Sequence, residues 1–243
     1  MGSGYAALLG SHGAAAVLGL FGAALCWFVP RLIARVPEPT QTSAPDYDGP
    51  TFTSLSADPS LLHTSLLWGG GAGVVLGESL GWRGGWFIAL VPVMVALGVI
   101  DHRTRLLPKS LVAPLYAAAV GLIGIQTATG VGDGSELLRA AWGWAIMGGF
   151  FALTWLISPR LMGYGDVRLA GVLGLLLGFL GWSALLVGLY AGFVVFTAQI
   201  VVAALVRRDR SLLRRRTPYG PAMLVGALIG VGAGPAIVGW LIG

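Results

Sequence analysis

Three acidic residues of this sequence, Glu78, Asp101 and Asp166, lie within or beside long apolar stretches. Asp101 ends the apolar part of "VMVALGVIDHRTRLLPKSLV", and Asp166 follows the glycine-rich "LMGYG". The other seven acidic residues occupy polar loops and are interpreted as solvated surface charges. Because a carboxylate at the edge of a membrane is costly, each of these three is a candidate for function.

Two carboxylates from distant parts of a chain can form one catalytic pair. If the side chains of Asp101 and Asp166 converge, they cannot both ionise freely, so one proton is shared. One carboxylate then acts as a base for water, and the other acts as an acid towards a carbonyl oxygen. This is the chemistry of aspartic proteolysis, which needs no covalent intermediate. Such a pair titrates as one unit.

Two glycines precede the second carboxylate. Gly163 and Gly165 remove side chains just before Asp166, so another backbone can approach closely and φ can become positive. An extended substrate strand could lie against this bare stretch through main-chain hydrogen bonds. The alternative is structural, because an aspartate at the start of a helix is often a cap or a partner of the helix dipole.

The composition determines which elements can position these residues. The chain is 56% hydrophobic and 10% charged, with a mean hydropathy of +0.83, whereas soluble domains are roughly 25% charged. An all-α, polytopic integral membrane protein is therefore expected. Stretches near the ~20 residues that cross a bilayer as helix number eight: 5–29, 63–80, 85–100, 110–129, 140–158, 168–183, 184–206 and 219–242. The boundary at 181–184 is the least defined of these.

The distribution of basic residues predicts the orientation. With eight crossings, alternate loops collect all the basic residues except Arg83 and Arg139. The positive-inside rule places those loops in the cytoplasm and both termini outside. Asp101 and Asp166 then share the cytoplasmic side of the membrane. The net charge of +5 is thus explained by topology, and we expect no nucleic-acid partner.

The chain is expected to be a single membrane domain, 1–243. The one sizeable polar segment, 36–61, is rich in Pro, Ser and Thr and is predicted to be an irregular cytoplasmic loop. The only cysteine, Cys26, can form neither an intramolecular disulfide nor a cysteine-rich zinc site. No metal and no other cofactor is predicted.

Three ordered motifs between Asp101 and the C-terminus, region 101–243, resemble those of the type IV prepilin peptidases, a bacterial group of membrane aspartic proteases. In that family an aspartate at a helix end is followed seven residues later by proline, as Asp101 is by Pro108. The G-x-G-D-x-[KR]-[LF] motif is matched by "GYGDVRL", which holds Gly163, Gly165, Asp166 and Arg168. The P-x-G-P segment is matched by Pro218, Gly220 and Pro221.

The resemblance implies an endopeptidase of the bacterial inner membrane with Asp101 and Asp166 as its catalytic dyad. It would remove the short leader of prepilin or pseudopilin substrates after a glycine, at the cytoplasmic face, while the substrate's hydrophobic helix stays in the bilayer. One departure is Lys109, where the family usually has Asp or Asn after the proline.

A second departure lies upstream. The bifunctional members carry a domain with paired Cys-x-x-Cys motifs between their first two helices, associated with N-methylation of the trimmed pilin. Here "FVPRLIARVPEP" resembles the sequence that precedes that domain, but only the polar loop follows it. We therefore predict cleavage without methylation and without zinc.

Several other residues have open roles. Arg168 could act on Asp166, on substrate or lipid phosphate, or mark the interface. His102 is interpreted as a solvated group in the interfacial loop. Glu78 is interpreted as a structural or interfacial charge. The cluster 207–216 is interpreted as a topology anchor that could also bind anionic membrane lipids.

Two other classes of protein compete with this interpretation. A transporter or channel could use membrane-embedded acidic residues, although no inverted repeat is visible. A presenilin-like protease shares G-x-G-D but has a Tyr-Asp pair, whereas Ile100 precedes Asp101 here.

Overall fold

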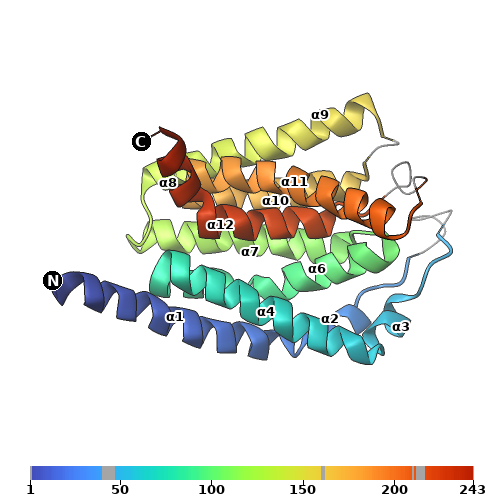
Figure 1. Cartoon of the computed structure of the whole chain (residues 1–243), viewed down its shortest axis with the longest axis horizontal. Coiled ribbons are helices and arrows are strands. Elements are labelled where there is room, and N and C mark those ends of the chain that lie inside the picture. The colour runs from blue at the N-terminus through green and yellow to red at the C-terminus, as the bar shows by residue number, and fades with distance from the viewer. Residues whose placement is uncertain (1, 40–46, 160–161, 210, 212–216, 243) are drawn as a thin grey trace. The chain divides into compact units, whose positions relative to one another are not determined.

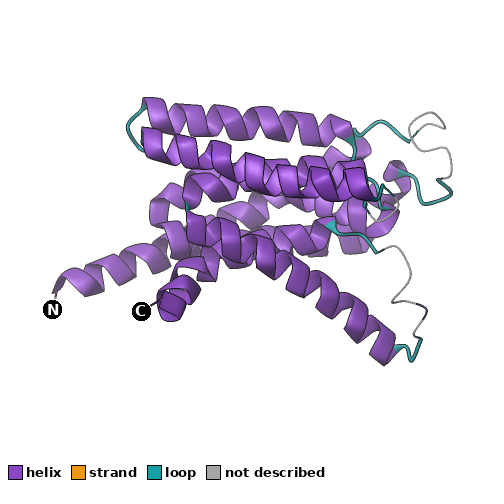
Figure 2. Ribbon diagram, turned by 90° about the horizontal axis from the view of Figure 1, so that it is seen from above, coloured by secondary structure: helices purple, strands orange, loops and turns teal. Residues whose placement is uncertain are grey.

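The computed structural model of this protein describes residues 2–39, 47–159, 162–209, 211 and 217–242. Within these ranges every regular element is a helix, and no strand is present (Figure 2). The predicted all-α, polytopic architecture is therefore confirmed. The chain divides into two compact units, Met1–Ala118 and Ala119–Gly243, which are described separately below.

The first unit is built on two long helices that lie side by side, α1 and α4 (Figure 1). Its elements are α1 (Gly2–Cys26), α2 (Val29–Ala34), α3 (Phe52–Ser56), α4 (Pro59–Leu80), the 3₁₀ turn η1 (Gly81–Arg83), α5 (Gly84–Ile88), α6 (Val91–Thr104) and the start of α7 (Lys109–Ala128). Small residues let α1 and α4 approach closely. A Cβ atom at Gly73 would overlap the backbone of Leu18 in α1.

The chain bends sharply between α5 and α6. The stretches Pro59–Ile88 and Val91–Thr104 meet at 85° across a break of a few residues. Gly81, which ends α4, has φ of +57°, a conformation that favours glycine over residues with a side chain. The predicted crossings 63–80 and 85–100 therefore correspond to one bent pair of helices.

The polar segment 36–61 is only partly irregular, because it contains the short helix α3 and the start of α4. Its residues 40–46 lie outside the described structure. The carboxylate of Glu38 accepts hydrogen bonds from the backbone N–H groups of Phe52 and Thr53, both at 2.8 Å, and so holds the first turn of α3. Further along, Asp58 forms an ion pair with Arg103 of α6, with 3.4 Å between Oδ2 and Nη2.

Acidification is expected to loosen this segment. Burial alone would raise the pKa of Glu38, but hydrogen bonds donated by Thr53 and Phe52 outweigh it and lower the pKa. A carboxylate with a lowered pKa contributes stability above its ordinary pKa, and that stability is lost as the pH falls through the lowered value. Limited proteolysis should therefore cut the segment faster at a pH well below the ordinary pKa of glutamate than at pH 7.

A substitution tests at neutral pH whether the charge of Glu38 stabilises this segment. Glu38→Gln removes the charge, so it should increase proteolysis of the segment at pH 7, whereas Asp48→Asn, at an exposed position in the same segment, should not. Equal proteolysis of the Glu38→Gln variant and the wild type would contradict the role given to Glu38.

The second unit surrounds helix α10. Its elements are the end of α7, α8 (Gly134–Gly143), the π-helical turn η2 (Trp144–Gly148), α9 (Gly149–Ile157), α10 (Tyr164–Leu180), α11 (Trp182–Val206) and α12 (Gly220–Ile242). Helix α10 contacts α8, η2, α9, α11 and α12, and most of its residues are buried. It is the central helix of this unit.

The C-terminal end of helix α10 is defined by a glycine and by an arginine from another helix. Helix α10 ends at Leu180 because Gly181 takes φ of +151°, and α11 starts directly at Trp182. The boundary expected at 181–184 therefore falls at Gly181, so that α10 ends three residues before 183 and α11 starts two residues before 184. The guanidinium of Arg139 in α8 donates hydrogen bonds to the last carbonyl oxygens of α10, those of Gly178 (2.8 Å) and Phe179 (2.9 Å). These carbonyls have no partner within their own helix.

Fewer helices are long enough to cross a membrane than the sequence pattern predicted. Among the described residues five single helical stretches qualify, and the bent pair makes a sixth. The five are His12–Ala34, Lys109–Ala128, Gly134–Ile157, Trp182–Val206 and Gly220–Ile242. The count of eight is not confirmed, because the bend joins two predicted crossings and α10 has only 17 residues.

Candidate active site

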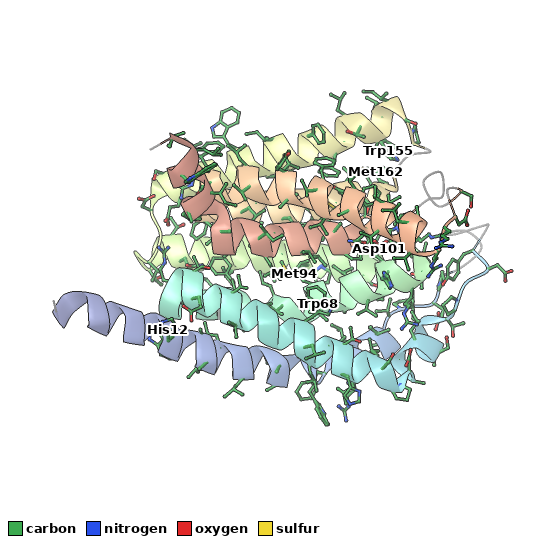
Figure 3. All side chains as sticks on the ribbon, in the orientation of Figure 1. His12, Trp68, Met94, Asp101, Trp155 and Met162 are labelled. Carbon is green, nitrogen blue, oxygen red and sulfur yellow. The ribbon has the colours of Figure 1, made fainter. Side chains whose placement is uncertain are left out.

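Asp101 lies in the last turn of α6 and is 3% exposed (Figure 3). The helix ends three residues later because Arg105 takes a left-handed conformation, with φ of +57°, and its N–H donates to the carbonyl of Asp101 at 2.8 Å. The hydroxyl of Thr104 donates to the carbonyl oxygen of Ile100 and accepts from the N–H of Leu106. This end of α6 is therefore tightly fixed.

Pro108 directly precedes the next helix, α7. Its carbonyl oxygen accepts hydrogen bonds from the N–H groups of Leu111 and Val112, which places it at the entrance of α7. The seven-residue spacing from Asp101 to Pro108 thus contains one helix end, a short connection and one helix start. The spacing separates two helices within the same unit.

Asp166 lies in the first turn of α10, in the second unit. Gly163 precedes the helix in an extended conformation, and its N–H donates to Oδ2 of Asp166 at 3.1 Å. The carboxylate thus caps the start of its own helix. The other oxygen, Oδ1, is buried and has no hydrogen-bond partner in the described part of the chain.

The glycines before Asp166 are not left-handed. Gly163 has φ of −76°, and Gly165 already belongs to the first turn of α10. The positive φ that the sequence allowed for these two glycines is therefore not found. A Cβ at Gly163 would lie 3.4 Å from Oδ2 of Asp166, at the edge of ordinary van der Waals contact, so space alone does not require glycine there.

Burial changes the acidity of Asp166. The residue precedes the apolar part of α10 and lies outside the helices that are long enough to span a membrane. Burial raises its pKa to about 6, and the hydrogen bond from Gly163 opposes this rise. At neutral pH most of the population is ionised, while protonation remains accessible.

The P-x-G-P segment interacts electrostatically with Asp166 through Tyr219. Pro218 and Tyr219 precede α12, and Gly220 and Pro221 form its first turn, where a proline is well tolerated. Burial, together with the negative charge of Asp166, raises the pKa of the Tyr219 hydroxyl. The second and third motifs of the sequence therefore belong to one unit and interact within it.

Tyr219 was not predicted as a site residue. Its ring packs against Phe151 of α9 and against Phe193 and Phe196 of α11, with centroids 4.7–5.7 Å apart. The signal in the sequence was its position inside the P-x-G-P motif, where it is the only polar side chain.

The remaining candidates have different surroundings. The guanidinium of Arg168 lies over the ring of Tyr164, at 4.5 Å from the centroid, and Tyr164 also contacts Trp155. His102 is exposed. Glu78 in α4 accepts a 2.7 Å contact from Nδ1 of His12 in α1, which agrees with a structural role.

The two aspartates belong to different units, Asp101 to the first and Asp166 to the second. Their convergence therefore stays a prediction. Among the described residues, no group of three or more His, Cys, Asp or Glu side chains could hold a metal ion.

Comparison with known proteins points to one family. Residues 88–206, which contain Asp101 and Asp166, match the model of the type IV leader peptidase family. Six curated proteins are significantly similar, and those described here are named prepilin leader peptidase/N-methyltransferase. No solved structure matches the chain significantly.

Three of these relatives show the extent of the similarity. The Aeromonas hydrophila protein is 29% identical over 161 residues, which is 66% of this chain and 53% of the relative. The Klebsiella pneumoniae protein is 32% identical over 115 residues, 47% of each chain. The Escherichia coli K12 protein is 28% identical over 150 residues, 57% of this chain and 59% of the relative. This chain thus spans about half the length of the curated relatives it matches.

Proposed function

We propose that this protein is an aspartic endopeptidase that removes the leader peptide of type IV prepilin-like proteins, because residues 88–206 belong to the type IV leader peptidase family. The observation that carries the proposal is the environment of Asp166. Its Oδ1 is buried without a hydrogen-bond partner in the described structure, beside the P-x-G-P segment. A buried carboxylate with a free oxygen is suited to bind and activate a water molecule.

The proposed reaction uses Asp101 and Asp166 as a dyad. Asp166, with a pKa of about 6, supplies the carboxylate that takes a proton from the attacking water. Asp101, buried at the end of α6, holds the proton that is donated to the scissile carbonyl oxygen. Water adds to the carbonyl carbon, the peptide C–N bond breaks, and the leaving nitrogen takes up the proton. No covalent intermediate forms.

The proposed substrate is a prepilin or pseudopilin with a short leader, a glycine and a following hydrophobic helix. The name that the relatives carry supports this class. We place the protein in the bacterial inner membrane, with both termini outside and both aspartates at the cytoplasmic face. The clustering of basic residues in alternate loops supports this orientation.

The activity is tested with the full chain purified in detergent or liposomes and a recombinant prepilin. Wild type should shorten the substrate by its leader, detected by mass spectrometry of the new N-terminus. An intact substrate, under conditions in which a bifunctional relative cleaves it, would overturn the proposal. Which of the two aspartates is essential is tested by the variants discussed below.

Cleavage without methylation is expected from the short segment between α2 and α4. Only about 25 residues lie there, and few of them are apolar, too few to form a separate domain. With a methyl donor such as S-adenosylmethionine present, the new N-terminus of the trimmed substrate should keep an unmodified amine. The control is the same product treated with a bifunctional relative. Appearance of an N-methyl group in the product of this chain alone would contradict the prediction.

A further inference from the structure

Tyr219 interacts electrostatically with Asp166, and the proposed reaction leaves this side chain without a role. It precedes α12, and its carbonyl oxygen accepts the N–H of Met223, so its backbone is fixed by the first turn of that helix. Its ring is held by Phe151, Phe193 and Phe196 from two other helices. The side chain is 6% exposed, and its position is therefore determined by packing on several sides.

The hydroxyl of Tyr219 is buried and has no hydrogen-bond partner among the described residues. Buried polar groups are nearly always paired, so an unpaired hydroxyl indicates a missing partner. The hydroxyl faces α11 at Gly192, where a Cβ would lie 3.6 Å from it. The aromatic rings around it offer no acceptor of comparable strength.

Oδ1 of Asp166 has the same property, being buried and without a partner in the described structure. The two groups interact electrostatically, yet no hydrogen bond joins them. A donor and an acceptor that are near each other but unpaired can both be satisfied by a third group. That group must accept a hydrogen bond from the hydroxyl and donate one to the carboxylate, as a peptide unit does through its C=O and its N–H.

We propose that the hydroxyl of Tyr219 binds the substrate main chain, by donating a hydrogen bond to a peptide carbonyl oxygen next to Asp166. This inference rests on the proposed peptidase function. The hydroxyl fixes the extended substrate backbone against the start of α10. Oδ1 of Asp166 has two lone pairs, so it can accept the substrate N–H and still accept a hydrogen bond from the attacking water. Because this contact exists before and during the reaction, it contributes to binding more than to the chemical step.

The test compares Tyr219→Phe with wild type in the prepilin cleavage assay. The substitution removes one oxygen and keeps the ring that packs against the three phenylalanines. Loss of one substrate hydrogen bond should raise KM by about tenfold and leave kcat within about twofold. Thermal unfolding in detergent should occur at the wild-type temperature or higher, because an unpaired buried hydroxyl disappears.

Tyr190→Phe is the matched control. Tyr190 lies on α11 and is 72% exposed, so removal of its hydroxyl should change neither KM nor kcat. An unchanged KM in Tyr219→Phe would overturn the inference. A loss confined to kcat, with a shift of the acid limb of the pH profile, would also overturn it, because the hydroxyl would then act through Asp166.

The result for the wild-type protein distinguishes failure of this inference from failure of the proposed function. Cleavage by wild type together with an unchanged Tyr219→Phe variant rejects the substrate contact alone. Failure of wild type to cleave rejects the peptidase function and the contact together. A peptide substrate in which the amide at the contacted position is replaced by an ester, a weaker acceptor, should raise KM for wild type but not for Tyr219→Phe.

Discussion

Asp166→Asn and Asp101→Asn should each reduce prepilin cleavage by roughly 10²–10⁴-fold, the range that a single acid–base group contributes. Asparagine has the size of aspartate but cannot exchange a proton, so each substitution removes the proposed acid–base function while keeping the size of the side chain. At position 166 the amide oxygen can still accept the N–H of Gly163, which should preserve the start of α10. The measurement is the initial rate of leader removal by purified full-length protein.

The double variant makes the test more specific. If the two aspartates share one proton and act as a unit, Asp101→Asn/Asp166→Asn should be no slower than either single variant. Independent contributions would instead multiply. Asp48→Asn is the control. Because Asp48 is exposed, this variant should cleave prepilin at the wild-type rate. Retention of activity by either single variant would remove that residue from the dyad.

Gly226→Ala should destabilise the second unit strongly. Helix α12 approaches α11 so closely at Gly226 that a Cβ there would overlap the backbone of Gly188 and Gly192. Forcing a methyl group into such a contact costs about 1–3 kcal/mol, whereas alanine gains at most about 1 kcal/mol in helix propensity. The steric term is the larger one, so a fall in the unfolding temperature of roughly 5 °C is expected.

Gly239→Ala is the matched control on the same helix. A Cβ at Gly239 meets no atom within 4 Å, so only the gain in helix propensity remains and the unfolding temperature should stay level or rise. Both variants are followed by circular dichroism during heating in detergent. Identical unfolding of Gly226→Ala and wild type would show that α11 and α12 can separate without cost. Because α12 begins directly after Tyr219, loss of the close contact between α11 and α12 at Gly226 should also weaken substrate binding.

The fold class could be predicted from the sequence because it depends on composition. Apolar segments of about 20 residues appear in any hydropathy pattern, and the break near residue 181 follows from a glycine between two such segments. The number of crossings could not be predicted in the same way. A run of apolar residues does not reveal an 85° bend after Ile88, and it does not reveal that α10 is a short, buried central helix.

The candidate site could be predicted only in part. The order of Asp101, the G-x-G-D motif and the P-x-G-P motif identified the relevant helix ends, since motifs record residue types and spacing. Spacing does not reveal which side chains lack a partner. Tyr219 was missed because its importance comes from burial among three phenylalanines on other helices, and Arg168 was left open because its stacking on Tyr164 depends on side-chain orientation.

The hydrogen bonds from Arg139 to the end of α10 have a consequence for Asp166. Arg139 of α8 binds one end of the 17-residue helix α10, and Asp166 lies in the first turn at its other end. At about 1.5 Å per residue, the carboxylate-bearing residue lies about 18 Å along the helix axis from Gly178. One residue added to or removed from α10 between these two points would move Asp166 by about 1.5 Å along the helix axis and turn it by about 100° around that axis.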